Sequence, residues 1–351
     1  MNYLPSASGL DRAVACTASV VLPQVSTSSP AAERGTAMHT YLEKVARGDD
    51  PIVAVESAPE QYREWLRLID VTKLFEDRSQ NLDIEQAFAL DVATSKVRFI
   101  TKLSDRDYGP VSDTEFVGTL DLSYRAASGR LVVRDYKSGM NLGDPSSKMQ
   151  LRFFALCYHL LLGKTEVDVE FVYVDEDGTI TTERAETPLG VLEFQETLGA
   201  LRELSGAVAT SRSAYALGAF PTVKPGDHCR YCGAYQHCPA KLSLLKTALP
   251  DVEFVAGSLA LMSPERIGSA YLKLQEIKNL TKHIDDVIRE CVEQQDLPLG
   301  NGKRLTMASS SRSSFDSNRL IALARKLGAD EGMIRSCMKK TTFDKLQQVK
   351  E

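Results

Sequence analysis

The sequence has no long hydrophobic run, and no stretch of it approaches the roughly 20 consecutive apolar residues that a transmembrane helix needs. Residues 1–5 also lack the basic and then apolar pattern of an export signal. Hydrophobic residues nevertheless make up 43% of the 351 positions and charged residues 25%, which is enough for one large core and an accessory unit. We therefore expect a folded, cytoplasmic protein without a membrane partner.

The chain also lacks an excess of positive charge. Its formal net charge is -5 at pH 7, whereas domains that bind nucleic acids are usually basic. The charge is unevenly distributed, because residues 301–351 hold eleven Lys or Arg against five Asp or Glu. This basic tail could contact phosphates, although a run of charge is more often a solvated face.

No internal repeat is visible, and patterns of strand and helix follow one another instead. Spacing and turn residues predict four successive elements: a strand over 117–124, a strand over 131–136, a helix that Ser146 or Ser147 caps and that ends at Leu162, and a strand over 167–174. Ala127, Ser128 and Gly129 provide a hairpin turn between the first two strands. Because strand, helix and strand imply a right-handed crossover in a mixed sheet, the predicted fold class is α/β.

Further segments flank this core. Residues 31–47 have apolar residues at helical spacing, whereas residues 51–115 are a long insertion without a readable motif. We expect residues 1–250 to form the core with a cysteine-containing helical region. Residues 251–351 are expected to form a mainly helical accessory region with the basic tail, and Ser263 is a good start for its long amphipathic helix.

Two aspartates and a lysine carry the candidate chemistry. If the hairpin turns about Ser128, Asp121 faces Asp135, and two-residue alternation places Lys137 on the same face. A register one residue different would send the aspartates to opposite faces. Two close carboxylates are tolerable when a cation lies between them, and their hard oxygens suit magnesium or manganese.

Two neighbouring helices supply further candidates. Gln150 and Phe154 lie four positions apart on the helix after the hairpin, on one face that can meet a metal or a DNA strand. Gly35 precedes His39 by four positions on an earlier helix. Taken alone, such a histidine is more often a surface residue, and the acidic hairpin is equally compatible with a surface salt bridge.

In this order the motifs resemble those of RecB-like nucleases of the PD-(D/E)XK superfamily. The family pattern G-x-x-x-H, G-x-x-D, D-x-K, Q-x-x-x-Y matches residues 35–39, 118–121, 135–137 and 150–154. The resemblance implies a restriction-endonuclease-like core, in which helices flank a mixed central sheet. It also implies a deoxyribonuclease that depends on Mg²⁺ or Mn²⁺.

The same resemblance implies a role for each matching residue. The implied metal ligands are His39, Asp121, Asp135 and the carbonyl oxygen of Tyr136. Lys137 would be the catalytic lysine, and Gln150 would position the DNA strand. Phe154 departs from the tyrosine of the family, which removes one hydroxyl contact.

The cysteines form a second pattern. The chain has seven, an odd number, and a short loop holds three of them, which in a reducing compartment indicates metal ligation before disulfides. The candidate ligands are Cys229, Cys232 and Cys238 in the loop and Cys16 near the amino terminus. Such a set can hold a [4Fe-4S] cluster or zinc, and His228 and His237 in the same loop leave a mixed zinc site open.

The cysteine layout resembles the iron-sulfur branch of this superfamily, which has one cysteine before the histidine motif and three after the core. That branch occurs in CRISPR adaptation and in helicase-nuclease repair complexes, so a helicase or recombination protein is an implied partner. The amino-terminal motifs also look like an uncharacterised phage-encoded group in this branch. Cys157, Cys291 and Cys337 lie on predicted helices and are expected to be packed thiols.

Two functions follow as expectations. The first is a metal-dependent DNA nuclease, acting from an end as an exonuclease or on single strands. The second is a catalytically silent DNA-binding or assembly protein in which an iron-sulfur or zinc site is structural. Acidic residues at a site that only binds DNA would repel phosphates, which favours the nuclease.

Overall fold

The computed structural model describes residues 4–24, 30–75, 78–101, 108–139 and 143–241, together with short stretches between 243 and 306. The chain divides into two compact units, Met1–Tyr271 and Leu272–Glu351. The boundary predicted at residues 250/251 lies outside the described residues. Most of the helix predicted after Ser263 and most of the basic tail also lie outside them.

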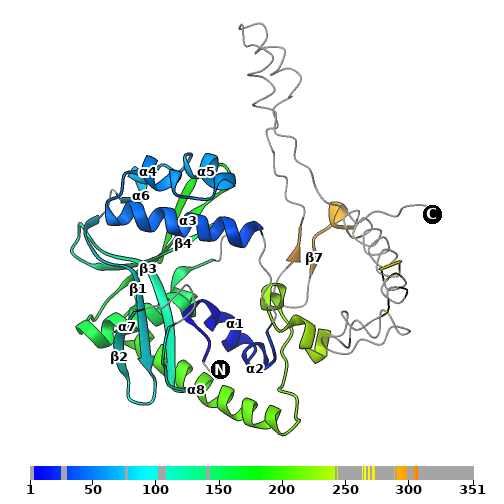
Figure 1. The fold of residues 1–351 in the computed structure, drawn as a ribbon. Helices are drawn as coiled ribbons and strands as arrows, with labels where there is room; N and C mark the ends of the chain where they lie inside the picture. The colour runs from blue at the N-terminus through cyan, green and yellow to red at the C-terminus, as the bar shows by residue number, and fades with distance from the viewer. Residues whose placement is uncertain are drawn as a thin grey trace, which may run out of the picture. The chain divides into compact units, whose positions relative to one another are not determined.

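The first unit is built on a six-stranded sheet with the order β2-β1-β3-β4-β5-β6 (Figure 1). Its strands are β1 (Arg78–Asp91), β2 (Lys96–Ile100), β3 (Glu115–Ala126), β4 (Leu131–Lys137), β5 (Asp168–Val174) and β6 (Ile180–Arg184). Neighbouring strands are antiparallel except β4 and β5, which are parallel. The sheet is therefore mixed, and the predicted α/β class is confirmed.

Helices cover both faces of the sheet (Figure 1). They are α1 (Leu10–Ala15), α2 (Ala18–Val21), α3 (Pro30–Arg47), α4 (Pro51–Glu56), α5 (Glu60–Leu66), α6 (Val71–Phe75), α7 (Met149–Leu162) and α8 (Val191–Ala216). The short 3-10 helices are η1 (Ala7–Gly9), η2 (Pro145–Ser147), η3 (Asp227–Tyr231) and η4 (Tyr235–His237). No helix among the described residues is long and apolar enough to cross a membrane.

Two hydrophobic clusters hold these layers together. On one face, α1, α7 and α8 bury residues such as Leu10, Phe154 and Phe194 against the sheet. On the other face, α3 to α6 bury residues such as Met38 and Leu66. Burying each large apolar side chain contributes about 1.5–3 kcal/mol, so the sheet is fixed from both sides where the candidate site lies.

The start of α7 differs from the prediction. Neither Ser146 nor Ser147 caps this helix, because Asp144 accepts hydrogen bonds from the backbone and side chain of Ser146 within η2. The helix begins at Met149, whose N–H donates to the carboxylate of Asp11, 3.0 Å away. A distant carboxylate thus satisfies the helix end, which a local capping pattern does not reveal.

The insertion at residues 51–115, for which no motif was readable, contributes three helices and two strands of the sheet. Strand β1 pairs with β3 over most of its length, with register shifts between Arg78 and Gln80 and between Asn81 and Asp83. The insertion is therefore part of the first unit's core and forms one wall of the candidate site.

In the second unit, the described residues include two short antiparallel strands, β7 (Leu297–Pro298) and β8 (Arg304–Leu305).

Candidate functional site

The site lies where the pairing between β3 and β4 ends. The two strands pair from Arg125 with Leu131 to Leu122 with Arg134, which is the register predicted for a turn about Ser128. Immediately beyond, the backbone N–H of Tyr136 donates to Asp121 Oδ2, 2.7 Å away. The carboxylate of Asp121 therefore accepts a hydrogen bond from a backbone N–H that would otherwise be available for strand pairing. This bond holds Asp121 in place where the paired region ends.

His39 from α3 forms the first half of the site with Asp121. Its Nδ1 lies 3.2 Å from Asp121 Oδ1, and its ring meets the ring of Tyr136 edge-on at 6.3 Å. Burial alone would lower the pKa of His39, but the carboxylate of Asp121 outweighs it and raises that pKa to about 9. Burial alone would likewise raise the pKa of Asp121, whereas His39 and Lys137 hold it below its usual value. The two groups thus form an ion pair.

The glycines of both motifs allow close packing around this pair. A Cβ on Gly35 would lie 3.0 Å from Ser138 Oγ, so α3 approaches the residue after β4 closely. A Cβ on Gly118 would lie 2.4 Å from the Cβ of Ala7 and 3.1 Å from Phe154. The short helix η1 and the helix α7 therefore pack directly on β3 near Asp121.

Asp135, Lys137 and Gln150 form the second half of the site. Lys137 Nζ lies 2.5 Å from Asp135 Oδ2 and donates to Gln150 Oε1 at 3.2 Å. The amide nitrogen of Gln150 donates to the other oxygen of Asp135 at 2.5 Å. Asp135 therefore contacts Gln150 on α7, whereas Asp121 contacts His39 on α3. The expectation that the two carboxylates share one face stays a prediction.

Burial and neighbouring charge set the protonation of this second half. Burial, together with the charge of Asp121, outweighs the effect of Lys137 and raises the pKa of Asp135 to about 6. Burial alone would lower the pKa of Lys137, but the carboxylates of Asp135 and Asp121 raise it. At neutral pH this lysine is therefore an ammonium ion.

Glu85 is a site residue that the sequence did not indicate. The pairs Ile84 with Leu122 and Gln86 with Leu120 place it across from Asp121 on the neighbouring strand. Its carboxylate offers an oxygen within 4.8 Å of ligand atoms of His39 and Asp121, which makes these three the possible metal-binding group among the described residues. No signal could have found it, because no strand was predicted around it.

An open pocket of about 410 Å³ gives access to this group. Its lining comes from α3, β1, β3 and Tyr108, and includes Thr36, His39, Glu43, Glu85, Thr119 and Asp121. A ligand as large as a phosphodiester could therefore reach a metal ion held by these side chains.

Phe154 and Gln150, four positions apart on α7, lie in different surroundings. Phe154 is fully buried and packs against Phe88 and Phe153, at ring distances of 5.9 and 5.2 Å. The interpretation that Phe154 meets the metal or DNA is wrong, because its side chain lies in the hydrophobic core. From this helix turn, Gln150 is the residue that reaches the site.

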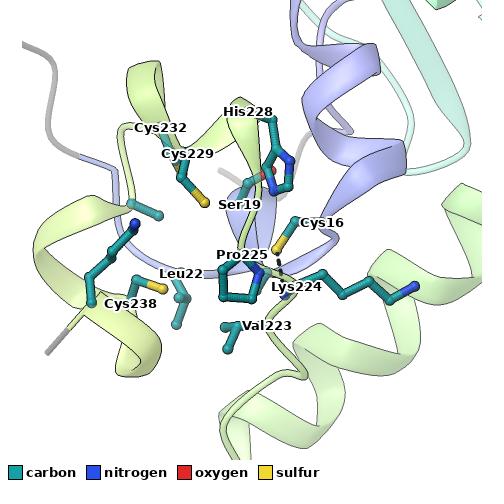
Figure 2. Close-up of a pocket in the computed structure, with 13 residues that line it drawn as sticks. Cys16, Ser19, Leu22, Val223, Lys224, Pro225, His228, Cys229, Cys232 and Cys238 are labelled. Carbon is teal, nitrogen blue, oxygen red and sulfur yellow. Dashed lines mark hydrogen bonds between the residues drawn. The ribbon is translucent and has the colours of Figure 1, made fainter. Parts of the chain in front are cut away.

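The four predicted cysteine ligands surround one pocket (Figure 2). Cys16 comes from the end of α1, and Cys229, Cys232 and Cys238 come from the segment around η3 and η4. Backbone N–H groups donate to two of the sulfurs, from Lys224 to Cys16 at 3.5 Å and from Gly226 to Cys229 at 3.4 Å. His228 lines this pocket, and His237 is not among its lining residues.

The spacing of these sulfurs bears on what they could hold. A single tetrahedral zinc ion with Zn–S bonds of about 2.3 Å brings its sulfurs to within about 4 Å of one another. Within the described part of the chain, no three cysteine sulfurs lie within 4.8 Å of one another. Four cysteines on one pocket are a ligand set that suits a [4Fe-4S] cluster or zinc.

The other cysteines differ from one another. Cys157 is completely buried, as predicted for a packed thiol, and burial raises its pKa. Cys291 is exposed, so its predicted packing is wrong. Cys337 lies outside the described residues.

Comparisons with known proteins give one family. The model of a family described as "Protein of unknown function (DUF2800)" matches residues 4–350. None of the curated proteins matches. A solved structure described as "Crystal structure of SSO0001" is 16% identical, over 59% of this chain and 84% of that chain, with a TM-score of 0.27, a value at which the likeness supports no argument. Since the family model covers nearly the whole chain, the protein belongs to the DUF2800 family.

Proposed function

We propose that this protein is a divalent-metal-dependent nuclease that hydrolyses phosphodiester bonds in DNA, with a restriction-endonuclease-like core of the RecB-like type. The observation that carries the proposal is the meeting of His39, Glu85 and Asp121 within 4.8 Å at an open pocket. The motif order G-x-x-x-H, G-x-x-D, D-x-K supports it independently. A surface salt bridge alone would not require three ligand side chains from three elements.

The donor set fits magnesium or manganese. Two carboxylates and one imidazole are suitable ligands for a hard or intermediate divalent cation, and the pocket leaves further positions open. When bound, such an ion polarises a phosphodiester and neutralises the charge that develops on phosphorus. Because His39 carries a proton beside Asp121 in the metal-free protein, binding is expected to release that proton.

Lys137 has an electrostatic role in this proposal. The carboxylates raise its pKa, so it stabilises the negative charge of the reacting phosphate and does not remove a proton from water. Gln150 bonds to both Lys137 and Asp135 and thereby fixes their relative orientation. Asp135, whose pKa is about 6, is ionised at pH 7 and can accept a proton from the attacking water.

The role of Asp135 as a metal ligand stays a prediction. Lys137 and Gln150 contact its two oxygens, and it is not part of the group formed by His39, Glu85 and Asp121. A ligand role would require Asp135 to leave one of those two contacts.

The test uses end-labelled single- and double-stranded DNA with Mg²⁺, Mn²⁺ or a chelator. We expect degradation with either ion, none with the chelator, and a loss of at least about 100-fold in Asp121→Ala and Lys137→Ala. Full activity in both variants would overturn the proposal. Binding of DNA without cleavage under every metal condition would favour the silent DNA-binding protein instead.

We propose further that Cys16, Cys229, Cys232 and Cys238 hold a [4Fe-4S] cluster. Two observations support this proposal: the four side chains line one pocket, and their layout along the chain is that of the iron-sulfur branch described above. The group would tie the amino-terminal helices to the segment after α8 and so closes a very long loop. Anaerobically purified protein should be brown and contain iron and sulfide, whereas a colourless zinc protein would overturn this assignment.

A further inference from the structure

The cysteine pocket contains two buried polar atoms that the ligand set does not explain. Neither Ser19 Oγ nor His228 Nε2 has a hydrogen-bond partner in the described part of the chain, and both atoms are inaccessible to solvent. Both residues line the pocket that the four cysteines surround (Figure 2). A buried hydroxyl or N–H without an acceptor is unfavourable, which points to an acceptor supplied by a bound group.

The local structure fixes both residues beside the pocket. Ser19 lies in α2, three residues after Cys16, and is 4% exposed. Its carbonyl accepts a hydrogen bond from Gln24, while its hydroxyl has no partner among the described residues. His228 lies in η3 immediately before Cys229. Its ring packs closely on Gly226, because a Cβ added to that glycine would lie 3.0 Å from the ring, and this contact restricts the ring.

Among the described residues, the other walls of the pocket supply no hydrogen-bond partner to these two atoms. They include the apolar side chains Ala18, Leu22, Val223, Pro225 and Ala234. The cysteine sulfurs line the same pocket, and two of them already accept backbone N–H groups from Lys224 and Gly226. The pocket thus brings two unpartnered polar side chains and two backbone N–H donors together with the four cysteines, as suits a bound group that carries negative charge.

We infer that Ser19 and His228 donate hydrogen bonds to the metal–sulfur group that the four cysteines hold, and that they raise its reduction potential. The inference rests on the proposed iron-sulfur cluster. A reduced cluster has one more negative charge than an oxidised one, so donors stabilise the reduced form more. His228 would act as the neutral tautomer with the proton on Nε2.

The experiment compares midpoint potentials of the full chain, purified anaerobically and titrated while the cluster signal is followed by electron paramagnetic resonance. Ser19→Ala and His228→Met each remove a donor and should shift the potential to more negative values, and the double variant should shift it further. His228→Gln keeps an N–H near the position of Nε2 and should stay close to wild type. His237→Met is the matched control, because His237 precedes Cys238 as His228 precedes Cys229 but does not line the pocket.

The outcomes separate this inference from the cofactor assignment. Unchanged potentials in Ser19→Ala and His228→Met, with full iron and sulfide content, overturn the donor role and leave the cluster standing. Absence of iron and sulfide from the wild-type protein overturns both. Should a variant fail to fold, pulsed electron paramagnetic resonance on wild-type protein with ¹⁵N-labelled histidine still decides. Weak coupling between the cluster and a histidine nitrogen supports a hydrogen bond, whereas the strong coupling of a nitrogen bound directly to iron overturns the donor role.

Discussion

Glu85 combines two features that are unfavourable in a strand without a bound ion. Its φ of +50° is a left-handed conformation, which disfavours a non-glycine residue by about 1–2 kcal/mol. It also lies across from Asp121, and like charges on facing strands are destabilising. Strain of this kind is found at functional sites, where another interaction offsets it, and a divalent ion between the carboxylates would do so.

Replacing this carboxylate should therefore act mainly on metal binding. In Glu85→Gln we expect the free energy of unfolding of the metal-free protein to change by less than about 1 kcal/mol, because the loss of repulsion from Asp121 is offset by the loss of attraction to the protonated His39. The affinity for Mn²⁺ should fall at least about tenfold. Urea unfolding with chelator and titration calorimetry with Mn²⁺ measure the two quantities.

The matched control is Glu43→Gln. Glu43 lines the same pocket but pairs with Arg47 at 3.0 Å and does not belong to the group of possible ligands. It should leave the Mn²⁺ affinity unchanged. Equal losses of affinity in the two variants would show that general negative potential, and not ligation, binds the ion.

Phe154 permits a second test at the scale of one residue. Phe154→Tyr restores the tyrosine of the RecB-like pattern, but the site of substitution is fully buried among Phe88 and Phe153. We expect a loss of about 1–3 kcal/mol in free energy of unfolding, since the new hydroxyl enters an apolar environment. The rate of DNA cleavage at saturating metal should not rise, and Phe99→Tyr, at a half-exposed ring, should cost little.

Gly118 in β3 determines how closely the short helix η1, which contains Ala7, can pack on the sheet. Gly118→Ala places a methyl group 2.4 Å from the Cβ of Ala7, so η1 or β3 must shift, at a cost of about 1–3 kcal/mol. In the double variant with Ala7→Gly we expect part of this loss to be recovered, and a double-mutant cycle in urea measures the coupling. Gly199→Ala, in open space on α8, should instead gain about 0.5–1 kcal/mol. Strictly additive effects at positions 7 and 118 would contradict the close contact.

The hairpin of β3 and β4 was predictable because its information is local. Turn residues fix the connection, and β-rich runs on both sides fix the register, so Leu122 faces Arg134 as expected. The helix over 31–47 and the crossover through α7 followed from periodicity in the same way. The direction in which Asp121 and Asp135 turn was not predictable, because it depends on which helix offers each carboxylate a partner.

Strand β1 shows where local reasoning stops. Residues 78–86 of this strand are mostly polar and include residues that are common in turns, Ser79, Asn81 and Asp83, so only pairing with β3 identifies them as a strand. Glu85 was missed for this reason. The cap of α7 was missed for a related one, since Asp11 is 138 residues away from the N–H that it accepts. Both features depend on tertiary contacts that no sequence window contains.

At the scale of the whole first unit, the cysteine pocket joins two distant parts of the chain. Cys16 belongs to a segment that packs on β3 and α7 through Ala7 and Leu10, whereas the other three cysteines follow α8. If a bound group bridges them, it removes from the unfolded chain the freedom of a loop of more than 200 residues. Loops of this length gain the most from closure in the chain-entropy model, about 5 kcal/mol.

Cys16→Ser should therefore destabilise the protein by more than the loss of one small buried side chain. We expect a decrease of about 2–5 kcal/mol in the free energy of unfolding. We also expect new proteolytic cleavage in the segment between Ala216, where α8 ends, and Cys229. Cys291→Ser, at an exposed thiol in the second unit, should change neither quantity. Since opening the bridge adds freedom to the unfolded chain and leaves the sheet and both hydrophobic clusters in place, Cys16→Ser should keep the helix and strand content of the wild type by circular dichroism. A variant that instead loses its sheet would show that Cys16 acts through core packing, and one that unfolds like wild type would show that no bridge exists.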